Sequence, residues 1–240
     1  MNVKTFTLAI VLLSCSRHAV AQKQLLNPFK GADKYTSLGA MASIPSGQFR
    51  STDIKNGGFA NTGWGLYLDS KTALKNGIYF VSHTTYSWVP LNQSAIAAAF
   101  TRELGRKTTI SGGKHMPFLT TVGFGYQVHP RKNMTFGLSA QGGLMYNSFK
   151  GFDITVYDVN NTTVLFTDNL KYDAQFSFAY VVGAQWGITL IKDLVDFQII
   201  ADYSGSKFTS PIRGSQIPSI NTDQHIQLIN VGAGITVHTK

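Results

Sequence analysis

The feature that most constrains the fold is a two-residue alternation that recurs in eight segments of the chain. In each segment large apolar side chains occupy every second position, and polar residues or glycines occupy the positions between them. Successive side chains of a β-strand point to opposite faces, so the alternation predicts eight strands that each have one apolar face. The predicted strands span residues 35–44, 59–69, 77–89, 116–128, 133–146, 175–190, 194–204 and 224–238.

The two faces of these predicted strands differ in kind. One face collects the aliphatic and aromatic residues, including Trp64, Phe124, Trp186 and Phe197, and the other carries small polar residues and nearly all strand glycines. Glycine inside a strand is typical of bends and of close backbone approach. We therefore expect a narrow, curved interior, with a polar network that includes Asp69, Gln185 and Asp202.

The connections between the predicted strands alternate in length, which favours an up-and-down barrel. Short connections fall at 70–76, 129–132 and 191–193, and long ones at 45–58, 90–115, 147–173 and 205–223. Strands that cross a bilayer need about 9–11 tilted residues, and bacterial barrels have even strand numbers from eight upward. The prediction is an all-β, transmembrane, eight-stranded antiparallel barrel with short periplasmic turns and four long extracellular loops. Interfacial girdles are expected from aromatic residues near the strand ends, namely Tyr86, Trp88, Tyr126, Tyr146, Phe176 and Tyr203.

Two of the long connections contain patterns of their own. In 90–115, Asn92 can cap a short helix whose apolar residues recur every four positions and which Gly105 ends. This helix would rest on the barrel rim or act as a gating lid. In 147–173, residues 154–157 and 164–166 predict a protruding hairpin that turns at Asn160 and Asn161.

Composition narrows the class of protein. Only 14% of the residues are charged and 12% are aromatic, which argues against disorder. After the N-terminus there is no run of about 18 apolar residues, which argues against a bundle of spanning helices.

The N-terminus has the features of a cleaved signal peptide. Lys4 precedes the short apolar run Phe6–Leu13, and Ala19 and Ala21 match the small-x-small cleavage pattern, with Gln22 as the first mature residue. The predicted organisation is a signal peptide at 1–21, a periplasmic segment at 22–34 and a barrel domain at 35–240. An alternative is a lipoprotein site, because residues 12–15 end in Cys15, the only cysteine.

The last predicted strand carries a family resemblance. Asn230, Gly232, Ile235 and Val237 fit the polar-x-Gly-x-x-apolar-x-apolar pattern with which outer-membrane barrels present themselves to their insertion machinery. Together with the eight strands, this pattern resembles the small OmpA/OmpX-like outer-membrane barrels, although such chains often end in an aromatic residue and this one ends in Lys240. The resemblance implies an integral outer-membrane protein that contacts the insertion machinery, and it implies no specific activity.

No enzymatic motif stands out in the sequence. The histidines are scattered, the Gly-x-Gly pairs lie inside strands, and Glu103 is the only glutamate, so no catalytic, cofactor or metal site is predicted. A lipid-modifying outer-membrane enzyme would need His83 with Ser82, or His115 with Glu103, near the outer rim. We instead expect His83 to form luminal hydrogen bonds and His115 to lie in a solvated loop.

The expected function is a non-enzymatic, monomeric outer-membrane barrel with a structural or surface-binding role. Its expected partners are outer-membrane lipid and lipopolysaccharide, whose phosphates would meet the basic residues of the 90–115 loop, and nucleic acid is not expected. Those basic residues are Arg102, Arg106, Lys107 and Lys114, and Lys207 and Arg213 add positive charge to a second long loop. Two alternatives remain, the lipid-modifying enzyme and a secreted lipocalin-like barrel that would turn its apolar faces inward around a ligand.

Overall fold

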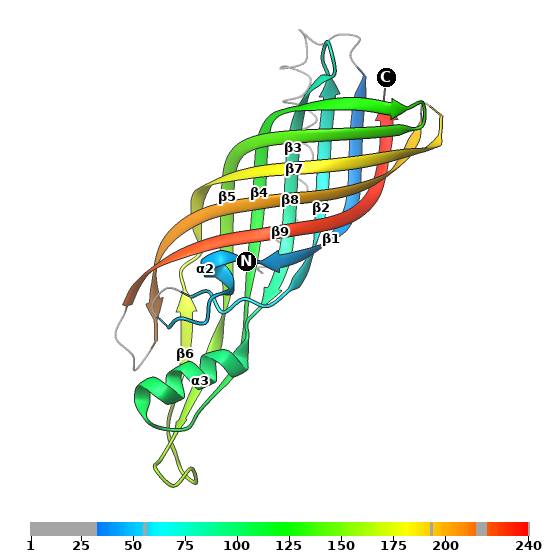
Figure 1. Ribbon diagram of the computed structural model, residues 1–240. Coiled ribbons are helices and arrows are strands. Elements are labelled where there is room, and N and C mark those ends of the chain that lie inside the picture. The colour runs from blue at the N-terminus through cyan, green and yellow to red at the C-terminus, as the bar shows by residue number, and fades with distance from the viewer. Residues whose placement is uncertain (1–32, 55–56, 193, 215–219, 240) are drawn as a thin grey trace, which may run out of the picture.

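The strands of the chain pair into a closed ring. The computed structural model describes residues 33–54, 57–192, 194–214 and 220–239. Within these residues eight antiparallel strands follow one another around the ring, which closes where the first strand pairs with the last (Figure 1). These strands are β1 (Lys34–Pro45), β2 (Gly63–Ala73), β3 (Ile78–Pro90), β4 (Thr108–Arg131), β5 (Met134–Tyr157), β7 (Gln175–Ile191), β8 (Val195–Arg213) and β9 (Ile220–Thr239). The predicted eight-stranded antiparallel barrel is confirmed.

The predicted faces are also confirmed around the ring. Trp64 and Phe124 lie on the outer surface, and Phe124 is 60% exposed, whereas Asp69 and Asp202 are buried inside. Ala60 is an exception, because β2 begins only at Gly63 and Ala60 lies buried before it. The closed ring with its apolar faces outward contradicts the lipocalin-like alternative, which needs those faces inside.

Several strands are longer than the alternation predicted. Residues 108–115 were expected in a loop but form the first part of β4, and β8 and β9 likewise extend through most of 205–223. β4 and β5 stay paired as far as Thr108 and Val156, beyond the other strands of the ring (Figure 1). The two-residue pattern missed the start of β4 because its apolar residue Ile110 packs into a separate core rather than continuing the outward-facing row of the ring.

This separate core forms a lobe that projects from the long-loop end of the barrel. The hairpin predicted at 154–166 exists, because the end of β5 pairs with β6 (Val164–Tyr172), and Asn161 in its turn has a φ of 60°. α3 (Gln93–Leu104) packs against this extension, with the predicted cap at Asn92 and a left-handed Gly105 at its end. α3 therefore supports the protruding hairpin and is not a lid over the barrel mouth (Figure 1). We call α3 and the projecting parts of β4, β5 and β6 the outer lobe.

Interior glycines make room for tyrosine rings. A side chain at Gly125 would overlap the ring of Tyr79, whose hydroxyl donates a hydrogen bond to the carbonyl of Leu138 at 3.1 Å. Gly39 and Gly234 face Tyr67 in the same way. The glycine-rich face thus reflects a barrel too narrow for two side chains at these positions.

Replacing Gly125 with alanine is expected to lower the free energy of unfolding by about 1–3 kcal/mol, because overfilling a packed interior forces side chains and backbone to shift. Gly187→Ala is the matched control, since the nearest heavy atom to its added carbon is 3.7 Å away. Urea titration of the refolded barrels, followed by tryptophan fluorescence, measures both changes. Equal loss in the two variants would contradict the proposed role of the Tyr79 ring.

Candidate functional site

The outer end of the barrel interior is filled by an apolar plug. α2 (Gly47–Arg50) lies at the barrel mouth beside β9, and Phe49, only 1% exposed, joins side chains from the strands around it (Figure 1). The plug consists of Phe49, Ala60, Val89, Leu119, Met145, Ala179, Val181, Phe208, Ile226 and Leu228. These side chains form one contiguous apolar cluster at this end of the interior, packed as densely as protein cores are.

Below the plug lies a buried cluster of charged groups. His83 Nδ1 is 2.5 Å from Asp69 Oδ1, and its Nε2 is 3.9 Å from Asp202 Oδ2. Asn230 donates a hydrogen bond of 2.7 Å to Asp202, and Lys71 Nζ lies 4.0 Å from Asp69. The carboxylates therefore have cationic or amide partners, as buried charges require. The predicted luminal network at Asp69 and Asp202 and the predicted role of His83 are confirmed.

The short-turn end of the interior holds a cavity of about 490 Å³. Lys71 donates hydrogen bonds to Gln185 and Gln198 at its inner wall, and His238 Nε2 contacts Asp196 at 2.8 Å. Gln185, predicted as a network member, is thus confirmed there. The sequence pattern missed Lys71 because the second predicted strand ended at Asp69 and left Lys71 in the short connection 70–76, whereas β2 continues to Ala73.

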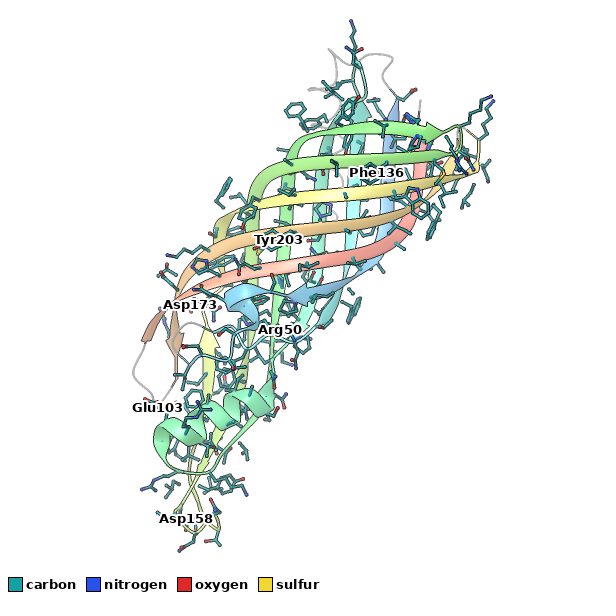
Figure 2. The ribbon with its side chains drawn as sticks, viewed as in Figure 1. Arg50, Glu103, Phe136, Asp158, Asp173 and Tyr203 are labelled. Carbon is teal, nitrogen blue, oxygen red and sulfur yellow. The ribbon has the colours of Figure 1, made fainter. Side chains whose placement is uncertain are left out.

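The outer surface of the ring carries a broad apolar belt. Its exposed and half-exposed members come from every strand of the ring: Leu38, Trp64, Leu66, Ile78, Val122, Phe124, Leu138, Leu144, Phe178, Val182, Phe197, Val231 and Ile235. Aromatic residues lie towards both ends of the belt. At the long-loop end Trp64 stacks on Trp88 at 4.2 Å and Tyr146 lies 4.7 Å from Phe176, and nearer the short turns Phe80 lies 5.6 Å from Phe124. Figure 2 shows Tyr203 and Phe136 on the outer side of the barrel wall. Apolar surface exposed on this scale is typical of a membrane or protein contact.

Charged groups lie on the surface beyond the ring. Asp158 at the hairpin tip accepts hydrogen bonds from the backbone N–H groups of Thr162 and Thr163, which hold the pKa of its carboxyl below the usual range (Figure 2). Near the barrel mouth, a hydrogen bond from Lys207 likewise lowers the pKa of Asp223. The surface beyond the ring thus carries charged groups beside exposed apolar residues such as Val159 and Leu165.

The predicted insertion-signal residues occupy both faces of β9. Asn230 is buried in the lumen, Gly232 packs against β1, and Ile235 and Val237 point outward. These positions agree with the predicted faces, and the signalling role stays a prediction. The signal peptide, its cleavage at Ala19-Val20-Ala21 before Gln22, and the alternative at Cys15 lie outside the described residues.

Neither catalytic pair considered from the sequence assembles. Ser82 and His83 are neighbours on β3 and so point to opposite faces of the barrel wall. His115 was expected in a solvated loop, but it is buried in β4 between Phe49 and Phe149, whereas Glu103 is exposed on α3 (Figure 2). The expectation for His115 was wrong because β4 begins earlier than the alternation indicated.

The described residues hold no group of three or more histidine, cysteine, aspartate or glutamate side chains that could bind a metal ion. Among the same residues no helix is both long and apolar enough to cross a membrane.

Comparison with solved structures finds outer-membrane proteins at low sequence identity. Neisserial surface protein A is 14% identical, with 86% of this chain and 95% of that chain covered and a TM-score of 0.38. Ail, the attachment invasion locus protein of Yersinia pestis, in complex with the heparin analogue sucrose octasulfate, is 10% identical over 87% and 99% of the two chains, at a TM-score of 0.44. A major outer membrane protein from Thermus thermophilus is 10% identical over 87% and 100%, at a TM-score of 0.47. No protein-family model and no curated protein matches the sequence.

Proposed function

We propose that the protein is an integral outer-membrane barrel, closed to solutes, that holds the outer lobe at the cell surface for binding. The single observation that carries this proposal is the apolar belt, which encircles a ring whose own interior is polar or plugged. A soluble protein would have to leave this belt in water. In a bilayer the belt contacts hydrocarbon, and the closed ring satisfies the backbone hydrogen bonds.

The interior of the barrel supports a binding role over a transport role. The plug around Phe49 fills the mouth with apolar side chains, and the buried cluster of Asp69, His83 and Asp202 lies between the plug and the cavity at the short-turn end. What remains for contact with the surroundings is the outer lobe, which has its own core and projects away from the ring. Loops and extensions on a rigid scaffold are where binding residues usually lie.

The proposed partners at the surface are the anionic lipids of the outer leaflet. Arg102, Arg106 and Lys107 lie on or beside α3, and Lys114 lies lower on β4, on the side of the belt that faces the lobe. Each basic residue near an anionic surface is worth about 1 kcal/mol of attraction, which salt weakens. Lipopolysaccharide phosphates are therefore the proposed counter-charges.

Cysteine labelling in intact cells tests the location and the orientation together. Val159→Cys places a thiol at the tip of the outer lobe, and Asn76→Cys places one in a short turn, in a chain whose one native cysteine is Cys15. A cell-impermeant maleimide should label the first variant in intact cells and the second only after the outer membrane is permeabilised. Labelling in the reverse order would contradict the orientation. Recovery of the protein in the soluble fraction would contradict the membrane location.

A further inference from the structure

Two lysines lie directly opposite each other on the outer surface of the barrel wall. Lys114 on β4 is the cross-strand partner of Lys150 on β5. Lys150 is exposed and Lys114 is half-exposed, and both continue the outward-facing row that contains Phe118 and Tyr146. Residues paired in this way have Cβ atoms about 5 Å apart, and like charges in such positions destabilise the pair.

Other basic residues near the same rim are neutralised within the chain. Lys207 forms an ion pair of 2.7 Å with Asp223, and Arg213 forms one of 2.9 Å with Asp173. Among the described residues neither Lys114 nor Lys150 has a carboxylate within 4.0 Å. The paired lysines therefore form a site of double positive charge that the described part of the chain does not balance.

The first acidic residue after Lys150 along β5 is Asp153, and its carboxylate already has a hydrogen-bond partner. Asp153 accepts a hydrogen bond of 2.6 Å from the side-chain amide of Asn169 on β6. It lies on the far side of Gly151 and Phe152, towards the outer lobe. A compensating negative charge for the two lysines is therefore expected from a ligand.

The height of the pair on the barrel indicates where that charge comes from. Lys114 and Lys150 lie four residues beyond Phe118 and Tyr146, and Tyr146 and Phe176 belong to the aromatic group at the edge of the belt. Four residues of a tilted strand rise about 10 Å along the membrane normal. Because aromatic residues of this kind mark the membrane interface, the lysines stand at the level of the lipid headgroups.

We propose that Lys114 and Lys150 together bind a phosphate group on the headgroup of an outer-leaflet glycolipid. This inference rests on the proposed membrane location. The lipid chains would lie along the belt below, against Leu144 and Phe178, while the phosphate lies between the two ammonium groups. A lipid phosphate, unlike free phosphate, is held at this height by its own chains.

The experiment compares Lys150→Gln and Lys114→Gln with the native chain in two kinds of vesicle, phosphatidylcholine alone and phosphatidylcholine with bisphosphorylated lipid A. Urea midpoints report the folded state in each. Lipid A should raise the midpoint of the native chain, and each substitution should weaken its apparent affinity for lipid A about fivefold. In phosphatidylcholine alone the substitutions should leave the midpoint unchanged or raise it, because they remove the repulsion between the lysines. If the lysines had a purely structural role, each substitution would change the urea midpoint in the same direction in both kinds of vesicle.

Lys207→Gln is the matched control, since it removes a lysine that already has Asp223 as its partner, and it should retain the response to lipid A. The proposal is overturned if both substituted chains respond to lipid A as the native chain does. It is also overturned if dephosphorylated lipid A or free inorganic phosphate produces the same shift. Failure of every chain to insert into either vesicle would instead overturn the membrane location itself.

Discussion

Arginine in place of Ile235 is expected to lower the free energy of unfolding in a bilayer by about 2–4 kcal/mol. The cost is largest at the bilayer midplane and falls for positions closer to the interface. Ile235 is 43% exposed on the outer face of β9, where it lies beside Leu38 of β1 and Phe197 of β8. The charge would enter hydrocarbon, which solvates ions poorly. Heat-modifiable gel migration and urea titration of the reconstituted protein measure the loss.

Val159→Arg is the control for this prediction. Val159 is 79% exposed at the tip of the outer lobe, so the same change there places the charge in water and should leave stability unchanged. Thr236, the lumen-facing neighbour of Ile235, is a poorer control than the alternation alone indicates. Its hydroxyl is hydrogen-bonded to Gln198 at 2.7 Å and to Ser37 at 2.8 Å, so an arginine would disrupt that network. Equal tolerance of arginine at 159 and 235 would contradict the lipid-facing position of Ile235.

Removal of the Asp69 carboxylate is the second change with a large expected effect. Asp69→Ala should lower the free energy of unfolding by about 3–5 kcal/mol, because it leaves partners of a buried ion pair without compensation. Asp69 is 4% exposed, and it contacts His83 at 2.5 Å and Lys71 at 4.0 Å. The measurement is again the urea midpoint of the refolded barrel.

A double-mutant cycle separates the pair from the general cost of a cavity. If Asp69 and His83 interact as the geometry indicates, Asp69→Ala with His83→Ala should cost clearly less than the sum of the single changes. Asp158→Ala serves as the control, since Asp158 lies at the hairpin tip, away from the barrel interior (Figure 2). Additive single changes at 69 and 83 would show that the two side chains are not coupled.

The strand number and the two faces of the barrel wall could be derived from the sequence. The reason is local, because side chains alternate along a strand whichever strands pair with it. An outward-facing apolar row can therefore be recognised in the sequence without knowing the neighbouring strands. Trp64, Phe124 and Ile235 were placed correctly on these grounds, as were the helix capped at Asn92 and the hairpin turn at Asn161. The pattern fails where a strand extends beyond the belt, which is why the start of β4 and the burial of His115 were missed.

What the sequence determined by itself is therefore the barrel: eight strands, an apolar exterior, a glycine-rich interior and alternating short and long connections. The tertiary structure alone decided which distant residues meet. Only the closed ring brings Asp69, His83 and Asp202 together, lets Phe49 close the mouth, and sets Lys114 opposite Lys150. The physical reason is that alternation is a property of one strand, whereas these contacts depend on the register between strands and on ring closure. Neither of these is encoded in the order of residues along any single segment.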